Sequence, residues 1–229
     1  MYMVEYVLYP VITFMTTYMG VSMIYYILDI HVVNNNRLVE RYKRQNTQVL
    51  VSDYKKVFWS VIINMIIMSV CNGMILTIIY YDNNITNEIT QNIIIMEIIK
   101  LFINKYIYEI FFTIGHYMMH KNKYLFIQIH KKHHENNKPF GMSGLYMTKS
   151  ELIYVGVICF QIGIYITNMH YITLCIYIFM ATLIFISSHS GYCDKILITN
   201  KRHDKHHEYY NCNYSNERII DIMMGTNMD

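Results

Sequence analysis

Three short groups of histidines have a spacing that can bind metal ions. They read "HYMMH" at 116–120, "HKKHH" at 130–134 and "HDKHH" at 203–207, in a chain with only 11 histidines. On an α-helix, residues i, i+3 and i+4 share one face, so the histidines of each group can point at one place. Neutral imidazole is a ligand for iron, zinc, copper and nickel. The pattern predicts a metal centre built from histidines.

A ninth histidine belongs with these eight, because His189 in "SSHSGY" directly follows an apolar run. The nine candidate ligands are His116, His120, His130, His133, His134, His189, His203, His206 and His207. One transition-metal ion takes roughly six ligands at most, and catalytic zinc about three from the protein. Nine imidazoles therefore suit two ions. His31 and His170 stand beside apolar runs without partners, and we interpret them as interfacial residues.

Carboxylates are sparse within the histidine groups. Soluble di-iron sites use Glu-x-x-His pairs on bundle helices, and the three groups lack that pattern. Glu135 and Glu208 follow the second and third groups, where they could accept the outer imidazole N–H and fix the ligand tautomer. An all-histidine pair of metals beside a membrane is typical of an oxygen-activating non-haem iron site.

The elements that carry these groups are membrane helices. The chain is 54% hydrophobic, and four uncharged apolar runs are long enough to cross a bilayer. These runs are Tyr6–Leu28, Val57–Tyr81, Leu152–Met169 and Tyr171–Ser188, the last two forming a predicted helical hairpin around His170. The sequence predicts an all-α, integral membrane helical bundle of four to five spans.

The fifth candidate span, Ile93–Ile114, contains four charged residues. Spacings of three and four would pair Glu97 with Lys100 and Lys105 with Glu109. Because unpaired charges are costly in a bilayer, this helix faces the bundle interior or lies at the interface. Glu109 is alternatively a group that supports the ligands around His116.

Loop charge predicts the orientation. Residues 31–56 carry six basic side chains, so this loop should be cytosolic; they are Arg37, Arg41, Lys43, Arg44, Lys55 and Lys56. All three histidine groups then lie in one cytosolic cap, and the glycosylation sequon Asn84-Ile85-Thr86 is luminal. The first run starts near Glu5 and lacks a small-x-small cleavage site, so we expect a retained anchor.

Other features narrow the class of protein. The net charge of +3 is modest, and the basic residues cluster around the spans, which indicates membrane topology and not nucleic-acid binding. The five cysteines show no C-x-x-C spacing, and we expect them to be reduced and structural. We divide the chain into N-terminal spans with a basic loop (1–104) and a histidine-bearing region (105–229).

The histidine groups and their flanks resemble the fatty acid hydroxylase/sterol desaturase superfamily, whose signature is H-x3-H, H-x2-HH and H-x2-HH. The segment "YLFIQIHKKHHENNKPFGMSGLY", the "HSGY" at 189–192 and the closing "HDKHHEYYNCNYSNERIIDIMMGT" are similar to the branch of sterol 4-methyl oxidase and cholesterol 25-hydroxylase. The resemblance covers about residues 105–227.

This resemblance implies a membrane-bound di-iron oxygenase that hydroxylates a C–H bond of a sterol or other lipid. The implied cofactors are two Fe ions, with O2 as co-substrate and NAD(P)H acting through a cytochrome b5-type electron donor. Zinc can replace iron by misloading. In a eukaryotic cell the implied location is the endoplasmic reticulum. Lysines and Arg202 around the histidine groups could dock an acidic carrier, although lipid phosphates or membrane topology are the simpler explanation.

Three alternatives stay open. The same centre could desaturate a sterol or fatty acyl lipid, since a second hydrogen abstraction can follow the first. A zinc-loaded hydrolase could use the histidines to activate water, although the spacing does not match H-E-x-x-H. A catalytically inactive protein could keep the fold and bind a sterol or another lipid.

Overall fold

The computed structural model describes residues 4–32, 45, 48–81, 91–192 and 199–228, and every structural statement below concerns these residues. They form helices and connecting loops without a β-strand. The predicted all-α class is therefore confirmed.

Four helical segments are long and apolar enough to cross a membrane, as predicted. The first is α1 (Tyr9–Ile27), which π-helical turns η1 (Val4–Leu8) and η2 (Leu28–Val32) extend at both ends, and the second is α3 (Val51–Tyr80). The third joins α6 (Lys149–Ile153), η7 (Tyr154–Ile158) and α7 (Cys159–Thr167), and the fourth is α8 (Tyr171–Ser188). Lys55 and Lys56 lie within α3, because the helix begins before its apolar run.

The hairpin between α7 and α8 turns within three residues. Asn168 ends α7 in a left-handed conformation, with φ of 43°, which Asn tolerates better than most residues. His170 precedes α8, and its side chain accepts a hydrogen bond from the Ile172 N–H. This confirms the predicted hairpin and places His170 at the opposite end of α8 from His189.

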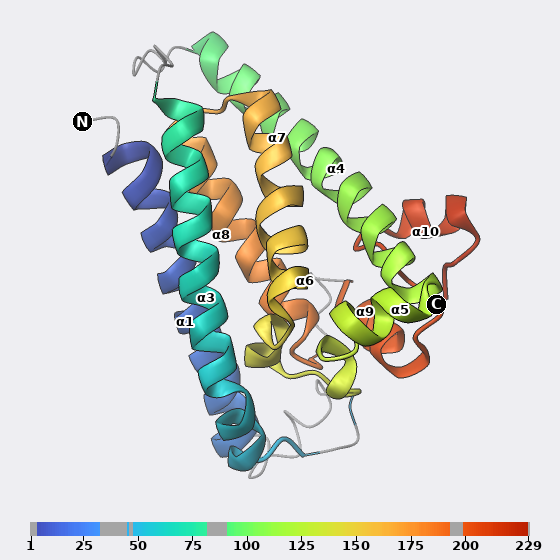
Figure 1. Ribbon diagram of the computed structural model, residues 1–229. Helices are drawn as coiled ribbons and strands as arrows, with labels where there is room; N and C mark the ends of the chain where they lie inside the picture. Colours follow the sequence, from blue (N-terminus) through green and yellow to red (C-terminus); the bar gives the residue numbers. More distant parts are fainter. Residues whose placement is uncertain (1–3, 33–44, 46–47, 82–90, 193–198, 229) are drawn as a thin grey trace.

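The fifth apolar run forms part of α4 (Gln91–Lys121), a single long helix that packs along α7. α4 is not one of the four candidate spans, and Figure 1 shows it inclined to the other long helices. The predicted pair is present, with Lys100 Nζ 2.6 Å from Glu97 Oε1. The predicted Lys105–Glu109 pair is wrong: Lys105 lies 2.7 Å from Glu217, because the end of the chain folds back onto α4.

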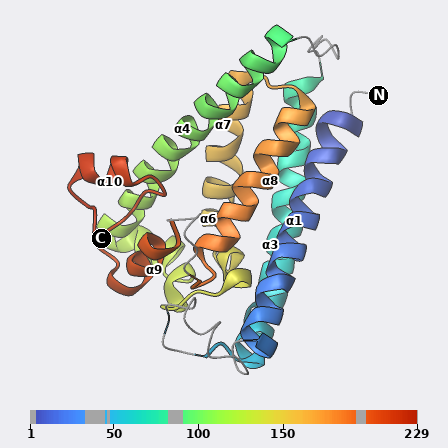
Figure 2. The same cartoon turned by 180° about the vertical axis from the view of Figure 1, so that it is seen from behind.

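A cap of short elements covers the end of the bundle at which α4 and α8 terminate (Figures 1 and 2). Its elements are α5 (Lys123–Leu125), η4 (Phe126–His130), η5 (His133–Glu135), η6 (Gly141–Leu145), α9 (Thr199–Tyr209) and α10 (Arg218–Met224). Buried polar groups join the cap to the spans. The Tyr18 hydroxyl in α1 donates to the Met142 carbonyl (2.8 Å) and accepts from the Leu145 N–H (3.2 Å).

Some sequence predictions fall outside the described residues. These are the basic residues Arg37, Arg41, Lys43 and Arg44, the sequon at Asn84, and Cys193. The other four cysteines are free thiols, as expected.

Candidate metal centre

The nine predicted histidines come together in two groups. The first group holds His116, His120, His130, His134 and His206, and the second holds His133, His189, His203 and His207. Within each group, one candidate ligand atom per residue lies within 4.8 Å of all the others. Both groups are therefore able to hold a metal ion. His31 is exposed, and neither it nor His170 belongs to a group.

Each H-x2-HH motif divides its histidines between the two groups, so the expectation that one motif points at one place is wrong. His130 and His134 belong to the first group and His133 to the second; His203 and His207 belong to the second and His206 to the first. The physical reason is the helical pitch: residue i+4 lies about 40° from residue i, whereas i+3 lies about 60° to the other side. The motif therefore presents two faces.

The second motif also departs from a regular α-helix. A π-helical turn ends at His130, and a 3-10 turn begins at His133. By contrast, His116 and His120 are separated by one turn of α4, and the third motif lies within α9. His189 directly follows α8. Five elements thus supply the nine imidazoles.

The ring nitrogens approach one another closely. Nε2–Nε2 distances are 3.1 Å for His116–His130, 2.9 Å for His130–His134, 3.2 Å for His133–His189, 2.9 Å for His189–His203 and 3.1 Å for His203–His207. The two groups are adjacent, since the ring centroids of His134 and His207 lie 4.5 Å apart.

Backbone carbonyls fix the tautomers of three histidines. A carbonyl oxygen only accepts, so Nδ1–H of His116 donates to Tyr214 O (2.7 Å), that of His206 to Cys212 O (2.7 Å), and that of His189 to Phe185 O (2.8 Å). In a neutral ring the other nitrogen then carries a lone pair. All three Nε2 lone pairs therefore lie within the two groups.

Burial keeps these rings neutral. It lowers the pKa of His116 and of His189 to about 4, and it lowers the pKa of His206 well below its ordinary value. Because metal ligation requires the neutral imidazole, the folded chain presents ligands that are ready at pH 7. Nε2 of His120 is also buried without a hydrogen-bond partner among the described residues, so it is a further candidate ligand atom of the first group. Inward lone pairs at this spacing fit a cation between them.

The carboxylate that orients a ligand is Glu151, which the sequence analysis missed. Nδ1–H of His130 donates to Glu151 Oε1 at 2.7 Å, and Glu151 is only 3% exposed. The expected roles of Glu135 and Glu208 are wrong. Glu135 accepts from the Tyr146 hydroxyl and lies near Lys56, and Glu208 is exposed. In the sequence, "TKSE" at 148–151 resembles a helix capping box, which hid this second role.

The end of the chain holds the loop that supplies the carbonyls for His116 and His206. Buried Asp221 accepts from the backbone N–H groups of Tyr214 (2.8 Å) and Ser215 (3.1 Å), and it pairs with Arg202. Arg202 is 5% exposed. It is therefore part of the scaffold, which corrects its expected place on a docking surface for an electron carrier.

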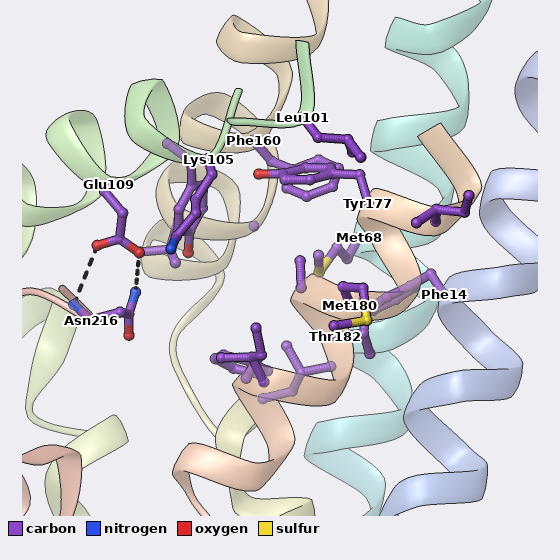
Figure 3. Close-up of a pocket in the computed structure, with 18 of the residues that line it drawn as sticks. Phe14, Met68, Leu101, Lys105, Glu109, Phe160, Tyr177, Met180, Thr182 and Asn216 are labelled. Carbon is purple, nitrogen blue, oxygen red and sulfur yellow. Dashed lines mark hydrogen bonds between the residues drawn. The ribbon is translucent and has the colours of Figure 1, made fainter. Parts of the chain in front are cut away.

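A mainly apolar cavity of about 550 Å³ lies between α4, α7 and α8 and reaches α1 and α3 (Figure 3). A small cavity next to it, lined by His116, His130, His133, His189 and His203, shares walls with it at Tyr108, Met147, Val155, Phe185 and Asn216. The large cavity thus ends beside the histidines. Its size falls within the roughly 300–1,000 Å³ of ligand pockets.

The fold and the site define a membrane protein with two adjacent histidine groups at the end of an apolar cavity. The family model described as "Fatty acid hydroxylase" matches residues 101–226. The chain belongs to this fatty acid hydroxylase family, within the superfamily indicated by the histidine motifs.

Three curated proteins illustrate the relationship. The chain is 29% identical over 129 residues to fatty acid hydroxylase domain-containing protein 2 of Macaca fascicularis, covering 56% of this chain and 38% of that protein. It is 29% identical over 133 residues to very-long-chain aldehyde decarbonylase GL1-8 of Oryza sativa subsp. indica (53% and 49%). It is 29% identical over 124 residues to methylsterol monooxygenase 2-2 of Arabidopsis thaliana (49% and 46%).

The matched region thus spans less than half the length of each of these relatives. No solved structure matches the chain.

Proposed function

We propose that the protein is a di-iron lipid oxygenase that inserts an oxygen atom into a C–H bond of a sterol or another lipid. One observation carries the proposal: nine histidines, seven of them buried and His120 and His203 half-buried, form two adjacent groups at the end of an apolar cavity. Two irons bound there would activate O2 with electrons from a carrier. The methylsterol monooxygenase among the relatives supports this class of reaction.

The chain's own residues hold and orient the site. The five-histidine group and the four-histidine group would each take one ion, with Glu151 and the carbonyls of Tyr214, Cys212 and Phe185 fixing ring orientation. Such supporting hydrogen bonds also raise the basicity of ligands. The apolar cavity beside the groups excludes water and leaves room for a substrate chain or ring system.

We further propose that electrons come from NAD(P)H through a cytochrome b5-type carrier that docks on the cap. Lys121, Lys123 and Lys131 support this, because they are exposed near the second histidine motif. A surface of one charge sign steers an oppositely charged partner. The cytosolic orientation of the cap, residence in the endoplasmic reticulum, and the division into spans (1–104) and catalytic region (105–229) belong to the same proposal.

The experiment is expression of the chain in yeast, with mass spectrometry of sterols and fatty acyl lipids and metal analysis of the purified protein. The test variant is His206→Ala/His207→Ala, which removes one ligand from each group. The matched control is His31→Ala, an exposed histidine outside both groups. A lipid that gains one oxygen atom with the wild type and the control, but not with the double variant, is the expected result.

The alternatives give different outcomes. A lipid that loses two hydrogen atoms identifies a desaturase with the same centre. Zinc in the protein after expression in iron-replete cells, together with hydrolysis of a lipid, would favour the hydrolase. Iron-free protein with no altered lipid would refute the oxygenase and favour an inactive lipid-binding protein.

A further inference from the structure

One edge of the large cavity is charged, and the remaining walls are mainly apolar, with Thr182 and the tyrosines Tyr108 and Tyr177 among them. Lys105, Glu109 and Asn216 lie on one side in Figure 3, across the cavity from Phe14 and Met68. Glu217 completes the polar edge. A ligand that fills this cavity must therefore be an amphiphile with a small polar end.

The charges at this edge disfavour an anionic ligand. Among the described residues that line the cavity, Lys105 is the only cationic side chain, and its Nζ lies 2.7 Å from Glu217 Oε1. A carboxylate on the ligand would meet Glu109 and Glu217 without an unpaired cation. Burying a charge without a partner is strongly unfavourable.

Glu109 has room for one more hydrogen bond. Its Oε2 accepts from Ser215 Oγ (3.1 Å) and the Asn216 N–H (3.2 Å), and its Oε1 accepts from Asn216 Nδ2 (2.8 Å). A carboxylate offers about four acceptor positions, so one remains on Oε1. Glu109 is buried, with 4% exposed. A ligand hydroxyl suits this position in either protonation state of Glu109.

The mouth of the cavity faces the apolar surface of the bundle. Three apolar residues that line the cavity are exposed, namely Phe102 of α4 (59%) and Ile176 (49%) and Met180 (46%) of α8, and Lys105 at the polar edge is exposed as well. α8 is a candidate membrane span. A ligand can therefore enter sideways from the bilayer without crossing water.

From these contacts we infer that the cavity binds an uncharged lipid with a hydroxyl head group, and that Glu109 and Asn216 recognise the hydroxyl. The inference rests on the proposed function, because it names the class of its substrate. A free fatty acid is excluded by the same charges. The apolar body lies against Met68 of α3 and Met180 of α8.

The test is equilibrium binding of labelled cholesterol and labelled oleyl alcohol to the purified, metal-free protein. Two pairs of unlabelled competitors are compared: cholesterol with cholesterol sulfate, and oleyl alcohol with oleate. The two members of each pair have the same apolar part and differ only in the head group. Ala181→Trp fills the cavity, because Ala181 lines it. The matched control is Ile78→Trp, because Ile78 lies in α3 and is 76% exposed.

We expect at least one labelled lipid to bind. The unlabelled hydroxyl form of that lipid should displace it at a concentration roughly tenfold or more lower than the anionic form requires. Ala181→Trp should lose this binding, and Ile78→Trp should keep it. Equal or better competition by the anionic form would overturn the head-group assignment. Absence of binding by both lipids, or full binding by Ala181→Trp, would overturn the site itself. Because no metal is present, a failed oxygenase reaction would leave this readout unchanged.

Discussion

The hydrogen bond from His130 to Glu151 makes a quantitative prediction about metal affinity. Glu151 is buried, and its Oε1 lies 2.7 Å from His130 Nδ1. Loss of a partner that orients a metal-binding histidine lowers metal affinity about 10–100-fold, which corresponds to about 1.4–2.8 kcal/mol. Glu151→Ala should therefore weaken binding to the first group by 10–100-fold. Glu151→Gln keeps an acceptor oxygen for the His130 N–H, so it should weaken metal binding less than Glu151→Ala does.

The assay is titration of the purified protein with Co²⁺, followed by visible absorption and by competition with a chelator. Glu208→Ala is the matched control, because Glu208 follows the third motif but is exposed. Unfolding of the metal-free variants shows whether the fold itself has changed. Wild-type Co²⁺ affinity in a folded Glu151→Ala protein would refute the role of Glu151 in orienting His130.

Three further predictions concern stability, measured by thermal unfolding in detergent; two are substitutions and the third is a dependence on pH. Asp221→Ala should destabilise the metal-free protein by about 3–5 kcal/mol, because it removes the carboxylate that pairs with the buried Arg202 guanidinium; an unchanged midpoint would contradict the scaffold role. Tyr18→Phe should cost about 1–3 kcal/mol by removing the hydroxyl between Met142 and Leu145, and no loss would show that the cap is held elsewhere.

Acid should also destabilise the metal-free protein. Burial lowers the pKa of His116 and His189 to about 4, against about 6.5 in the unfolded chain. Between these values the unfolded state binds more protons, so stability is full above pH ~6.5 and falls by about 1.4 kcal/mol per pH unit per histidine as the pH drops toward 4. A midpoint independent of pH between 7 and 5 would contradict this.

Some of the structure could be predicted because it depends on local sequence. Long uncharged runs must be helical in a bilayer, since every backbone polar group needs a partner there, and all four predicted spans are present. The hairpin between α7 and α8 could also be predicted from local sequence, because only His170 separates the two apolar runs. The observed bounds of a helix differ from the predicted ones where charged residues such as Lys56 extend the helix beyond its apolar part.

Other features depend on tertiary structure and could not be read from spacing. Lys105 pairs with Glu217, far along the chain, and a periodic pattern offers only the nearer Glu109. The nine histidines were identified by type and spacing, but their division between two groups depended on tertiary packing, since the regular helix α9 divides its motif just as the irregular turns around His130 and His133 do. Glu151 was hidden because a carboxylate three residues after Thr148 already has a common local explanation.

The division of each H-x2-HH motif between both groups links the two metal equilibria. An ion in the first group would orient His130 and His206, and the segments that carry these two residues also carry His133 and His203 of the second group. The first binding event therefore lowers the conformational entropy cost of the second, which is positive cooperativity without any contact between the ions. We therefore expect the two sites to fill over one range of metal concentration and not in two separate steps.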